Sequence, residues 1–379
     1  MRIGFDAKRA FHNTRGLGNY SRILIDGLLE YYPENQYFLF GKKPKTGVGA
    51  SWMNTCNDST VMIEPRITSS VGQALWRSWG MSKAIREYKI DLHHGLSHEL
   101  PLRMNNNTRY VVTIHDLLFL RFPQYFKWID IQIYLAKIKF SCKHAHRIIA
   151  VSEQTRNDLI GFLQVPAEKI EVCYQSCSPA FYQQASDFAI ADVKQHYDLP
   201  AEYFLFVGAL VRHKNIGRIL EAVAMLQVNL QLPLVIVAKP NKYKLDLLQK
   251  INRLNIADKV IFVDYIASEH MPMLLQGAKL MIWPSLFEGF GIPIIEAQFS
   301  RLPVITSNTG CFPEAGGKGA YYVDPNNSEE ISKAITHLMT HNDLYAEMQQ
   351  LGYEHAQKFH LKNTSAELMK IYSQVAKIE

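Results

Sequence analysis

Short runs of apolar and β-branched residues alternate along the chain with longer segments whose apolar residues recur at helical spacing. In the first half, this pattern predicts helices such as those at 18–31 and 128–142, and strands at 2–6, 36–41, 60–63, 92–94, 110–114 and 147–151. The second half repeats the rhythm, with strands expected at 203–207, 233–238, 260–262, 280–283 and 303–307. Such alternation predicts an α/β protein with two Rossmann-like domains, each a parallel sheet covered by helices on both faces.

The length of the chain also favours two domains, because 379 residues exceed what a single hydrophobic core usually holds. The segment from Gln175 to Asp187 contains several serines and no strong periodicity, so we expect the boundary there. The predicted domains are residues 1–180 and residues 181–355. Ligands of parallel sheets bind at the carboxyl ends of the strands, so we expect the active site in a cleft between the domains.

The apolar segments and the cysteines indicate the compartment in which the protein is found. No signal peptide and no apolar run of about 20 residues is visible, so we expect a cytoplasmic protein. The cysteines are few and scattered, and no zinc-type spacing accompanies them, which predicts reduced structural thiols and no metal site. They are Cys56, Cys142, Cys173, Cys177 and Cys311.

Positive charge belongs to the first half of the chain. Residues 1–185 hold 23 Lys and Arg against 15 Asp and Glu, and residues 186–379 hold 18 against 20, which together give the net charge of +6. The segments Trp76 to Lys83 and Arg121 to Trp128 mix cations with large aromatic residues. They indicate either a peripheral contact with an anionic membrane, at its inner face, or aromatic core residues of helices with a solvated basic side. The charge is otherwise dispersed and no recognition module is present, so nucleic acid is not an expected partner.

Two polar segments follow strands of the first half. Gly16 and Gly18 open the first helix, where backbone amides could face a ligand, but a third glycine of a dinucleotide fingerprint would fall on Ser21. A plain strand-to-helix turn is the alternative. His115 comes directly after the strand at 110–114, where it could hold a sugar hydroxyl or stabilise charge, although a structural histidine is the alternative.

The second half places cations and acids after its strands. Arg212 and Lys214 follow the strand at 203–207 and could bind a diphosphate, although surface cations at such a place are common. Glu288 and Glu296 flank a helix start whose amides attract anions, and Gly289 and Gly291 leave room for a phosphate. Carboxylates beside a phosphate site suggest a ligand with vicinal hydroxyls, whereas the alternative is two solvated acids near a helix N-terminus.

The order of these motifs resembles the retaining nucleotide-sugar glycosyltransferases of family 4, which are mannosyltransferase-like group 1 enzymes with the GT-B fold. The resemblance covers nearly the whole chain and is strongest over Val207 to Asn215 and Trp283 to Pro325. It implies an acceptor-binding N-terminal domain, a C-terminal domain that binds the nucleotide sugar, and a final helix at 356–379 that packs back on the first domain.

The resemblance also implies site roles. His115, Glu288 and Lys214 match the catalytic positions, Lys214 also matching the diphosphate-binding lysine, and Glu296 matches the residue that holds the ribose hydroxyls. The other matched donor-binding positions are Gly16, Gly18, Arg212, Val263, Ile266, Gly289, Phe290, Gly291 and Ile292. In one departure, Ala209 stands where many members carry arginine, which leaves open whether Arg212 or His213 supplies the second phosphate contact.

The implied function is transfer of a hexose, with mannose from a GDP donor as the first expectation, to a glycan or lipid-linked acceptor in polysaccharide or lipopolysaccharide synthesis. No Asp-x-Asp occurs in the chain, so we expect cations and a helix dipole to replace a divalent ion, and no cofactor beyond the sugar donor. The alternatives are a nucleotide-sugar epimerase or phosphorylase on the same fold, and a non-catalytic nucleotide-sugar binder.

Overall fold

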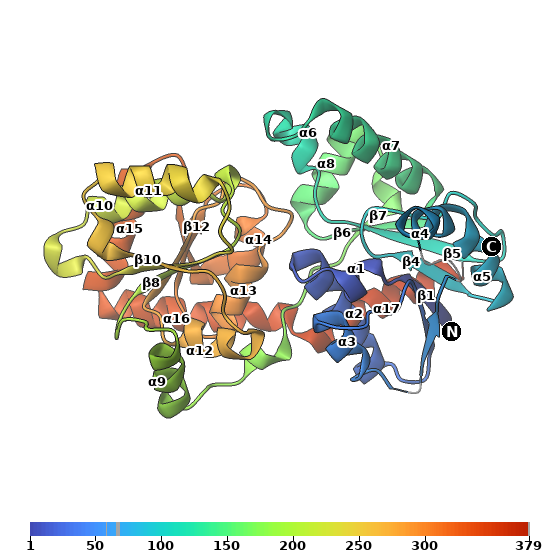
Figure 1. Cartoon of the computed structure of the whole chain (residues 1–379), viewed down its shortest axis with the longest axis horizontal. Helices are drawn as coiled ribbons and strands as arrows, with labels where there is room; N and C mark the ends of the chain where they lie inside the picture. The colour runs from blue at the N-terminus through green and yellow to red at the C-terminus, as the bar shows by residue number, and fades with distance from the viewer. Residues whose placement is uncertain (58, 66–68, 378–379) are drawn as a thin grey trace. The chain divides into compact units, whose positions relative to one another are not determined.

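The computed structural model describes residues 1–57, 59–65 and 69–377, which fold into two compact units. Unit 1 comprises Met1–Ser176 together with Leu361–Glu379, and unit 2 comprises Cys177–His360. The chain therefore crosses between units after Ser176 and again after His360, where the sequence predicted boundaries after residues 180 and 355. Figure 1 shows that each unit consists of a sheet flanked by helices.

Unit 1 is built on a sheet of seven strands in the order β3-β2-β1-β4-β5-β6-β7, and every neighbouring pair is parallel. The strands are β1 (Arg2–Asp6), β2 (Gln36–Phe40), β3 (Thr60–Ile63), β4 (Leu92–Gly95), β5 (Arg109–Ile114), β6 (Arg147–Ala150) and β7 (Ile170–Val172). Its helices are α1 (Lys8–His12), α2 (Gly16–Tyr31), α3 (Val48–Met53), α4 (Ser70–Leu75), α5 (Met81–Glu87), α6 (Leu118–Arg121), α7 (Trp128–His144), α8 (Glu153–Leu163) and α17 (Leu361–Ala376). A single π-helical turn, Trp76–Gly80, joins α4 to α5.

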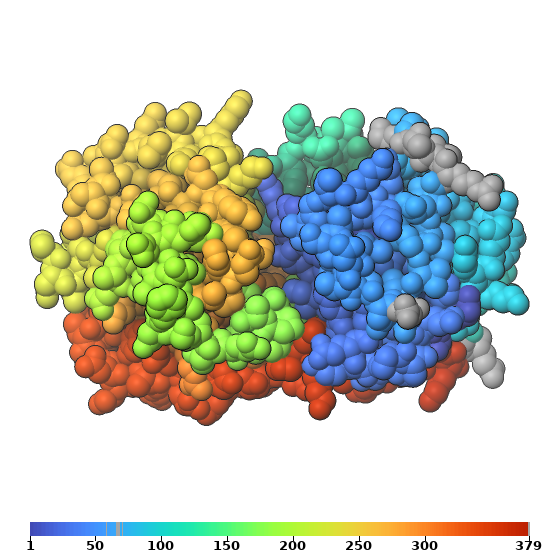
Figure 2. Space-filling view, turned by 60° about the horizontal axis from the view of Figure 1, so that its bottom comes forward, coloured from blue at the N-terminus to red at the C-terminus, as the bar shows by residue number. Residues whose placement is uncertain are grey.

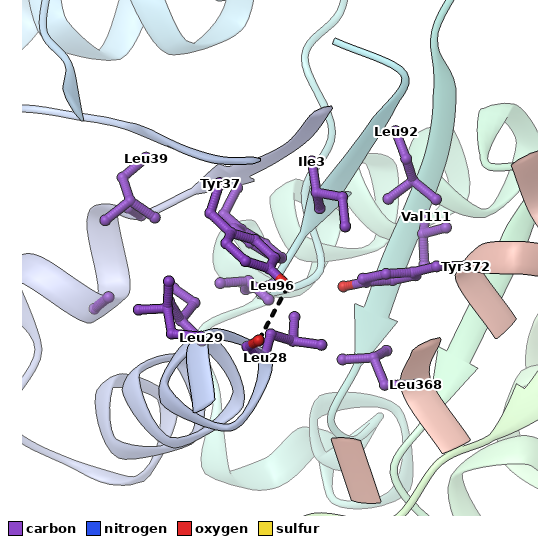
Figure 3. Close-up of a cluster of buried hydrophobic side chains, with 14 of the residues drawn as sticks. Ile3, Leu28, Leu29, Tyr37, Leu39, Leu92, Leu96, Val111, Leu368 and Tyr372 are labelled. Carbon is purple, nitrogen blue, oxygen red and sulfur yellow. Dashed lines mark hydrogen bonds between the residues drawn. The ribbon is translucent and has the colours of Figure 1, made fainter. Parts of the chain in front are cut away.

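Both faces of this sheet are buried, because alternate residues of its strands enter two separate apolar clusters. Phe5 and Leu39 belong to the cluster beneath α2 and α17, whereas Phe38 and Val112 belong to the cluster on the side of α5, α7 and α8. Figure 3 shows part of the first cluster, in which the Tyr37 hydroxyl donates a hydrogen bond to the Leu28 carbonyl at 3.1 Å. The predicted coverage of the sheet by helices on both faces is confirmed for this unit.

Unit 2 contains a parallel sheet of six strands in the order β10-β9-β8-β11-β12-β13. The strands are β8 (Phe204–Val207), β9 (Leu234–Val237), β10 (Val260–Val263), β11 (Leu280–Trp283), β12 (Val304–Ser307) and β13 (Ala320–Val323). The helices are α9 (Asp187–His196), α10 (Ile216–Ala224), α11 (Tyr243–Arg253), α12 (Met271–Gln276), α13 (Ile292–Phe299), α14 (Phe312–Gly316), α15 (Ser328–Thr340) and α16 (Asn342–Ala356). The predicted fold class, two Rossmann-like parallel sheets, is thus confirmed.

The sequence pattern missed the short edge elements. Strand β7, with three residues, and strand β13, with four, were not predicted, and each completes an edge of its sheet. Helix α1 was also missed, because its five residues span little more than one turn. Across the described part of the chain, no helix combines the length and the apolar character needed to cross a membrane.

Helix α17 completes unit 1 although it follows unit 2 in the sequence. It lies beside α2 (Figure 1), and its Leu368 and Tyr372 belong to the cluster that contains Leu28. In the space-filling view (Figure 2), red atoms of the C-terminal segment surface beside the blue N-terminal residues of the same unit. The two helices approach closely at Gly27, where an added Cβ would lie 2.2 Å from the Ser365 hydroxyl and 2.7 Å from Leu361 Cδ1.

We predict that Gly27→Ala lowers the melting temperature of the protein, because a methyl group at this position forces α2 and α17 apart. Overpacking of this kind costs about 1–3 kcal/mol. The matched control is Gly161→Ala on α8, where an added Cβ meets no atom within 4 Å. That change should be neutral or stabilise the helix by up to about 1 kcal/mol. Calorimetry of both variants checks the prediction, and equal melting temperatures for the two would contradict it.

Candidate active site

Two neighbouring strands of unit 2 bring the predicted cation and the predicted acids together. Because β8 and β11 pair in parallel, the loops that follow them leave the same edge of the sheet. The loops are tied by the Leu286 amide, which donates to the His213 carbonyl at 2.7 Å, and by the Asn215 side chain, which donates to the Pro284 carbonyl at 2.9 Å. Asn215 has φ 62°, a left-handed conformation that asparagine tolerates better than most residues.

Lys214 and Glu288 form an ion pair between these loops. The Lys214 Nζ lies 2.5 Å from Glu288 Oε1, and both side chains are largely buried, with 14% and 17% exposed. The same Nζ lies 4.3 Å from the centroid of the Trp283 ring, which adds a cation–π contact. Oε1 is buried and makes no hydrogen bond of good geometry, so its interaction with Lys214 is electrostatic. The pair holds the Lys214 ammonium group against Glu288, three residues before the N-cap of α13.

Helix α13 begins at a turn that contains two glycines. Its N-cap, Gly291, has φ 145° and no side-chain cap, and an added Cβ would lie 3.1 Å from the Ala315 Cβ. Phe290 turns into the core against Phe359, at 5.3 Å between ring centroids, so it offers the loop only its backbone. Gly289 and Ile292 flank this turn and are half-buried. A helix start without a side-chain cap can attract an anion.

Glu296 lies about one turn inside α13 and differs from Glu288 in its partners. Its side chain is half-buried, and among the residues that the structure describes no side chain or amide forms a hydrogen bond with its carboxyl group. Burial raises the pKa of Glu296 from 4.5 to about 8. An unpaired carboxyl group of this kind is suited to accept hydrogen bonds from hydroxyls of a ligand.

The remaining predicted donor residues of unit 2 take no part in the ion pair. Arg212 is 70% exposed and turns toward α11, where it is 3.8 Å from Asp246 and 5.9 Å from the centroid of the Tyr243 ring. Val263 ends β10 and is half-buried, and Ile266 is buried in the loop that follows. The Arg212 side chain is therefore directed to α11, and its assignment as a phosphate ligand stays a prediction, as do those of Val263 and Ile266.

His115 lies at the carboxyl end of β5 in unit 1, and both of its ring nitrogens have partners. Nε2 is 2.9 Å from the Leu96 carbonyl, which can only accept, so Nε2 carries the proton and Nδ1 accepts from the Gln175 amide at 3.1 Å. Burial, and then the nearby His98, lower its pKa to about 3. His115 is therefore neutral, and a substrate can hydrogen-bond to this ring only by replacing Gln175 or Leu96.

A chain of buried hydrogen bonds begins at Tyr20, whose ring packs against His115. The Tyr20 ring meets the His115 ring edge-on at 4.6 Å, and its hydroxyl contacts the Thr113 hydroxyl at 2.9 Å. The Thr113 hydroxyl in turn contacts His94 Nε2 at 2.8 Å, and His94 Nδ1 contacts the Tyr372 hydroxyl at 2.6 Å. Helix α17 thus helps to hold the groups beneath the predicted active-site histidine.

The two glycines of the first loop have different reasons to be glycine. Gly16 and Gly18 both lie in the first turn of α2. An added Cβ at Gly18 would lie 1.8 Å from the Asn13 carbonyl oxygen, so packing within unit 1 already requires this glycine. At Gly16 an added Cβ meets no described atom within 4 Å. Packing within unit 1 therefore explains why residue 18 is glycine, but it does not explain the glycine at position 16.

Sequence reasoning missed a charged cluster at the ends of β1 and β4. Arg77 Nε binds Asp6 at 3.0 Å, Arg77 Nη2 binds Glu99 at 3.2 Å, and Lys137 Nζ binds Glu99 at 2.9 Å. Burial alone would raise the pKa of Asp6, but Arg77 holds it below its usual value. Its members are far apart in sequence, so no local motif announces it. The cluster also holds Arg77 inside the fold. A cation that contacts a membrane would have to be exposed, so Arg77 does not fit that role.

The aromatic segments divide between the core and the surface. Trp76 and Phe126 pack on the apolar cluster that contains Val112, which agrees with the core interpretation. Trp79 and Trp128 are exposed by 49% and 74%. On α7, Trp128 is joined by Ile129, Ile133 and Tyr134, which are exposed by 60%, 47% and 45%. We call these four residues the α7 apolar face.

The cations near this face are not equivalent. Arg121 binds Asp158, whose side chain is only 2% exposed, with Nε to Oδ2 at 2.8 Å, so this arginine is part of the fold. Lys127, which precedes α7, is exposed. With respect to metals, residues 1–57, 59–65 and 69–377 contain no group of three or more His, Cys, Asp or Glu side chains placed to hold an ion.

Comparison with known proteins identifies relatives for both units. The family model of glycosyl transferases group 1 matches residues 190–375, and that of glycosyltransferase family 4 matches residues 48–179. The O-antigen chain mannosyltransferase B of Escherichia coli is 28% identical over 292 residues, which cover 76% of this chain and 76% of that protein. The O-antigen chain mannosyltransferase RfbU of Salmonella typhimurium is 31% identical over 241 residues, which cover 64% of this chain and 63% of that protein.

Solved structures show the same fold. The Anabaena protein HepE, crystallised with UDP and glucose, has a TM-score of 0.74 at 19% identity, covering 99% of this chain and 100% of that one. The sucrose-phosphate synthase of Thermosynechococcus elongatus has a TM-score of 0.79 at 18% identity, with 99% of each chain covered. With matching family models over both units, this chain belongs to glycosyltransferase family 4 and is a glycosyltransferase with the GT-B fold.

Proposed function

We propose that this enzyme transfers a hexose, mannose as the first candidate, from a nucleoside-diphosphate sugar such as GDP-mannose to a glycan or lipid-linked acceptor during cell-surface polysaccharide synthesis. The observation that carries the proposal is the Lys214–Glu288 pair in the loops before α13, whose start has no side-chain cap, with the unpaired Glu296 one turn further on. The relatives named for O-antigen mannosyl transfer support the choice of sugar and acceptor.

In the proposed reaction, the residues of unit 2 stabilise the departing nucleoside diphosphate. Lys214 and the amides at the start of α13 offset the negative charge that develops on it, so a divalent ion is not required. Glu296 accepts hydrogen bonds from the ribose hydroxyls, and Glu288 lies beside the transferred sugar. The transfer proceeds with retention at the anomeric carbon, and the leaving phosphate accepts the proton of the acceptor hydroxyl.

A diphosphate at this place shares the Lys214 ammonium group with Glu288. In the structure the lysine is already paired, so donor binding adds a second anion to the same ammonium group. The three N–H bonds of an ammonium group allow it to serve both partners. Glu288 thus keeps Lys214 in place before the donor arrives.

We further propose that unit 1 meets an anionic membrane through the α7 apolar face, at the cytoplasmic side. Four exposed apolar side chains on one helix, preceded by the exposed Lys127, combine the two interactions that hold a protein at a lipid surface. A lipid-linked acceptor would be presented at such a surface.

We predict that Lys214→Ala lowers the rate of transfer from GDP-mannose about 100-fold, since removing one electrostatic partner of a developing charge costs about 3 kcal/mol. Glu288→Gln should mainly lower kcat, whereas Glu296→Gln should mainly weaken donor binding. Lys250→Ala is the control, because Lys250 is a half-buried lysine of the same unit that is paired with Glu221. Transfer is measured by product analysis with and without a metal chelator.

The same assay separates this function from its alternatives. Conversion of the donor without an acceptor would indicate an epimerase, phosphate-dependent cleavage would indicate a phosphorylase, and donor binding without turnover would indicate a sensor. Full transfer activity in both Lys214→Ala and Glu288→Gln would rule out the site. A loss of activity on chelation that added metal restores would contradict metal independence.

The raised pKa of Glu296 predicts a pH-dependent cost to stability. Between pH 4.5 and about 8 the unfolded chain releases this proton while the folded protein retains it, so the stability of the fold decreases as pH rises through that window. Glu296→Gln stays neutral throughout. Relative to this variant, the melting temperature of the wild type should fall from pH 5 to pH 8 and then level off, and parallel pH profiles for the two proteins would contradict the shift.

For the membrane contact, we predict that Trp128→Ala and Lys127→Ala each weaken binding to vesicles rich in phosphatidylglycerol. The lysine should contribute about 1 kcal/mol, or roughly fivefold in affinity, and its effect should disappear in high salt. Phe188→Ala is the control, because Phe188 is 82% exposed but lies on α9 of unit 2. Binding that ignores salt and both substitutions in unit 1 would refute the contact.

A further inference from the structure

His98 has a backbone conformation that its side chain disfavours. It lies in the loop after β4 with φ 65°, in the left-handed region that residues with a Cβ rarely adopt. Its own amide donates to the Thr113 carbonyl at 2.9 Å, which holds the loop against β5. Strained residues of this kind persist where the surrounding structure fixes them, and they concentrate at functional sites. His98 is absent from the motifs that the sequence singled out.

The position of the proton on His98 follows from its neighbour. The backbone N–H of His115 donates to His98 Nε2 at 3.3 Å, and an N–H group can only donate, so Nε2 bears the lone pair. Burial lowers the pKa of His98 to about 4, with Glu99 opposing and Arg9 assisting the shift, so the ring is neutral at physiological pH. The proton of the neutral ring is therefore on Nδ1.

Nδ1 of His98 is a donor without a partner among the described residues. The ring stacks on His115 at 5.3 Å between centroids with an interplanar angle of 17°, which fixes the direction of its nitrogens. The adjacent carboxylate of Glu99 is already bound by Arg77 and Lys137 and does not take this proton. His98 is half-buried and lies at the carboxyl edge of the sheet, where β4 and β5 end.

The ring of the neighbouring His115, unlike that of His98, has no nitrogen without a partner. His115 is 6% exposed, and both of its ring nitrogens are used within unit 1, by Leu96 and Gln175. At this edge of the sheet, the histidine with an unused donor is therefore His98, and His115 fixes the orientation and tautomer of its ring.

We propose that His98 contacts substrate directly, its Nδ1–H donating a hydrogen bond to a hydroxyl oxygen of a sugar substrate. The inference rests on the proposed function, which supplies a substrate rich in hydroxyls. Such a hydroxyl belongs either to the acceptor glycan or to the sugar of the donor, and kinetics with each substrate varied in turn distinguishes the two.

Two substitutions separate this role from a purely structural one. In His98→Asn the side-chain amide N–H lies near the place of Nδ1, and asparagine tolerates the left-handed conformation, but the side chain is too short to reach the His115 amide. In His98→Gln the side-chain oxygen reaches about as far as Nε2 and can accept from the His115 amide, but no donor stands at the place of Nδ1.

We expect His98→Gln to lower kcat/KM for one sugar substrate about 2- to 12-fold, which is the usual effect of losing one neutral hydrogen bond. His98→Asn should stay closer to wild type. The substrate whose kcat/KM changes carries the hydroxyl: the acceptor if its kinetic constants change, and the donor if those of GDP-mannose change.

A glycine pair controls for backbone strain. His98→Gly relieves the left-handed conformation but removes the donor, the acceptor of the His115 amide and the stacked ring, so it should lose at least as much activity as His98→Gln. Gln164→Gly makes the same backbone change at φ 51°, at the end of α8, and should keep full activity.

The outcomes are distinguishable from failure of the proposed function. A wild-type protein that transfers no sugar would refute the proposed function itself. An active wild type in which His98→Gln matches or exceeds His98→Asn overturns the inference, because the residue then serves only the His115 amide. Loss of activity in proportion to melting temperature across the His98 variants would overturn it in the same way.

Discussion

The site in unit 2 depends on one constraint, which is that β8 and β11 lie inside a parallel sheet and carry only apolar side chains. All four residues of β11 are buried, and three of the four in β8 are, so the first positions open to charge are in the loops beyond their carboxyl ends. Lys214 and Glu288 occupy those loops in unit 2, and His98 and His115 occupy the equivalent places in unit 1. In unit 2 the charged groups lie beyond the strand ends because the strands themselves are apolar, whereas in unit 1 β4 and β5 also contribute the buried His94 and Thr113.

At those strand ends each charge is held by a partner within its own unit. Lys214 is fixed by Glu288 and Trp283, and Arg77 by Asp6 and Glu99. Such pairs restrict long flexible side chains before any ligand arrives, so less conformational freedom is lost on binding. Glu296 is the exception, because burial without a partner leaves its carboxyl group protonated at neutral pH.

The sequence predicted those features whose signal is local. Strand ends followed by polar residues located His115, Lys214 and Glu288, and the glycines of the turn located the start of α13. His98 and Gln175 escaped notice because their importance lies in a backbone angle and in hydrogen bonds between distant loops. The direction of the Arg212 side chain was equally beyond reach, since it is set by Asp246 and Tyr243 on another helix.

The placement of α17 has a consequence for how the chain is made. Unit 1 needs Tyr372 and Leu368 to close its core around Leu28, yet these residues leave the ribosome only after the whole of unit 2. Residues 177–360 can therefore reach their native packing while the earlier-made half still exposes the apolar side of α2. During synthesis the N-terminal unit, although first to emerge, is the last to be finished, and for that interval it is the part of the nascent chain most in need of chaperones.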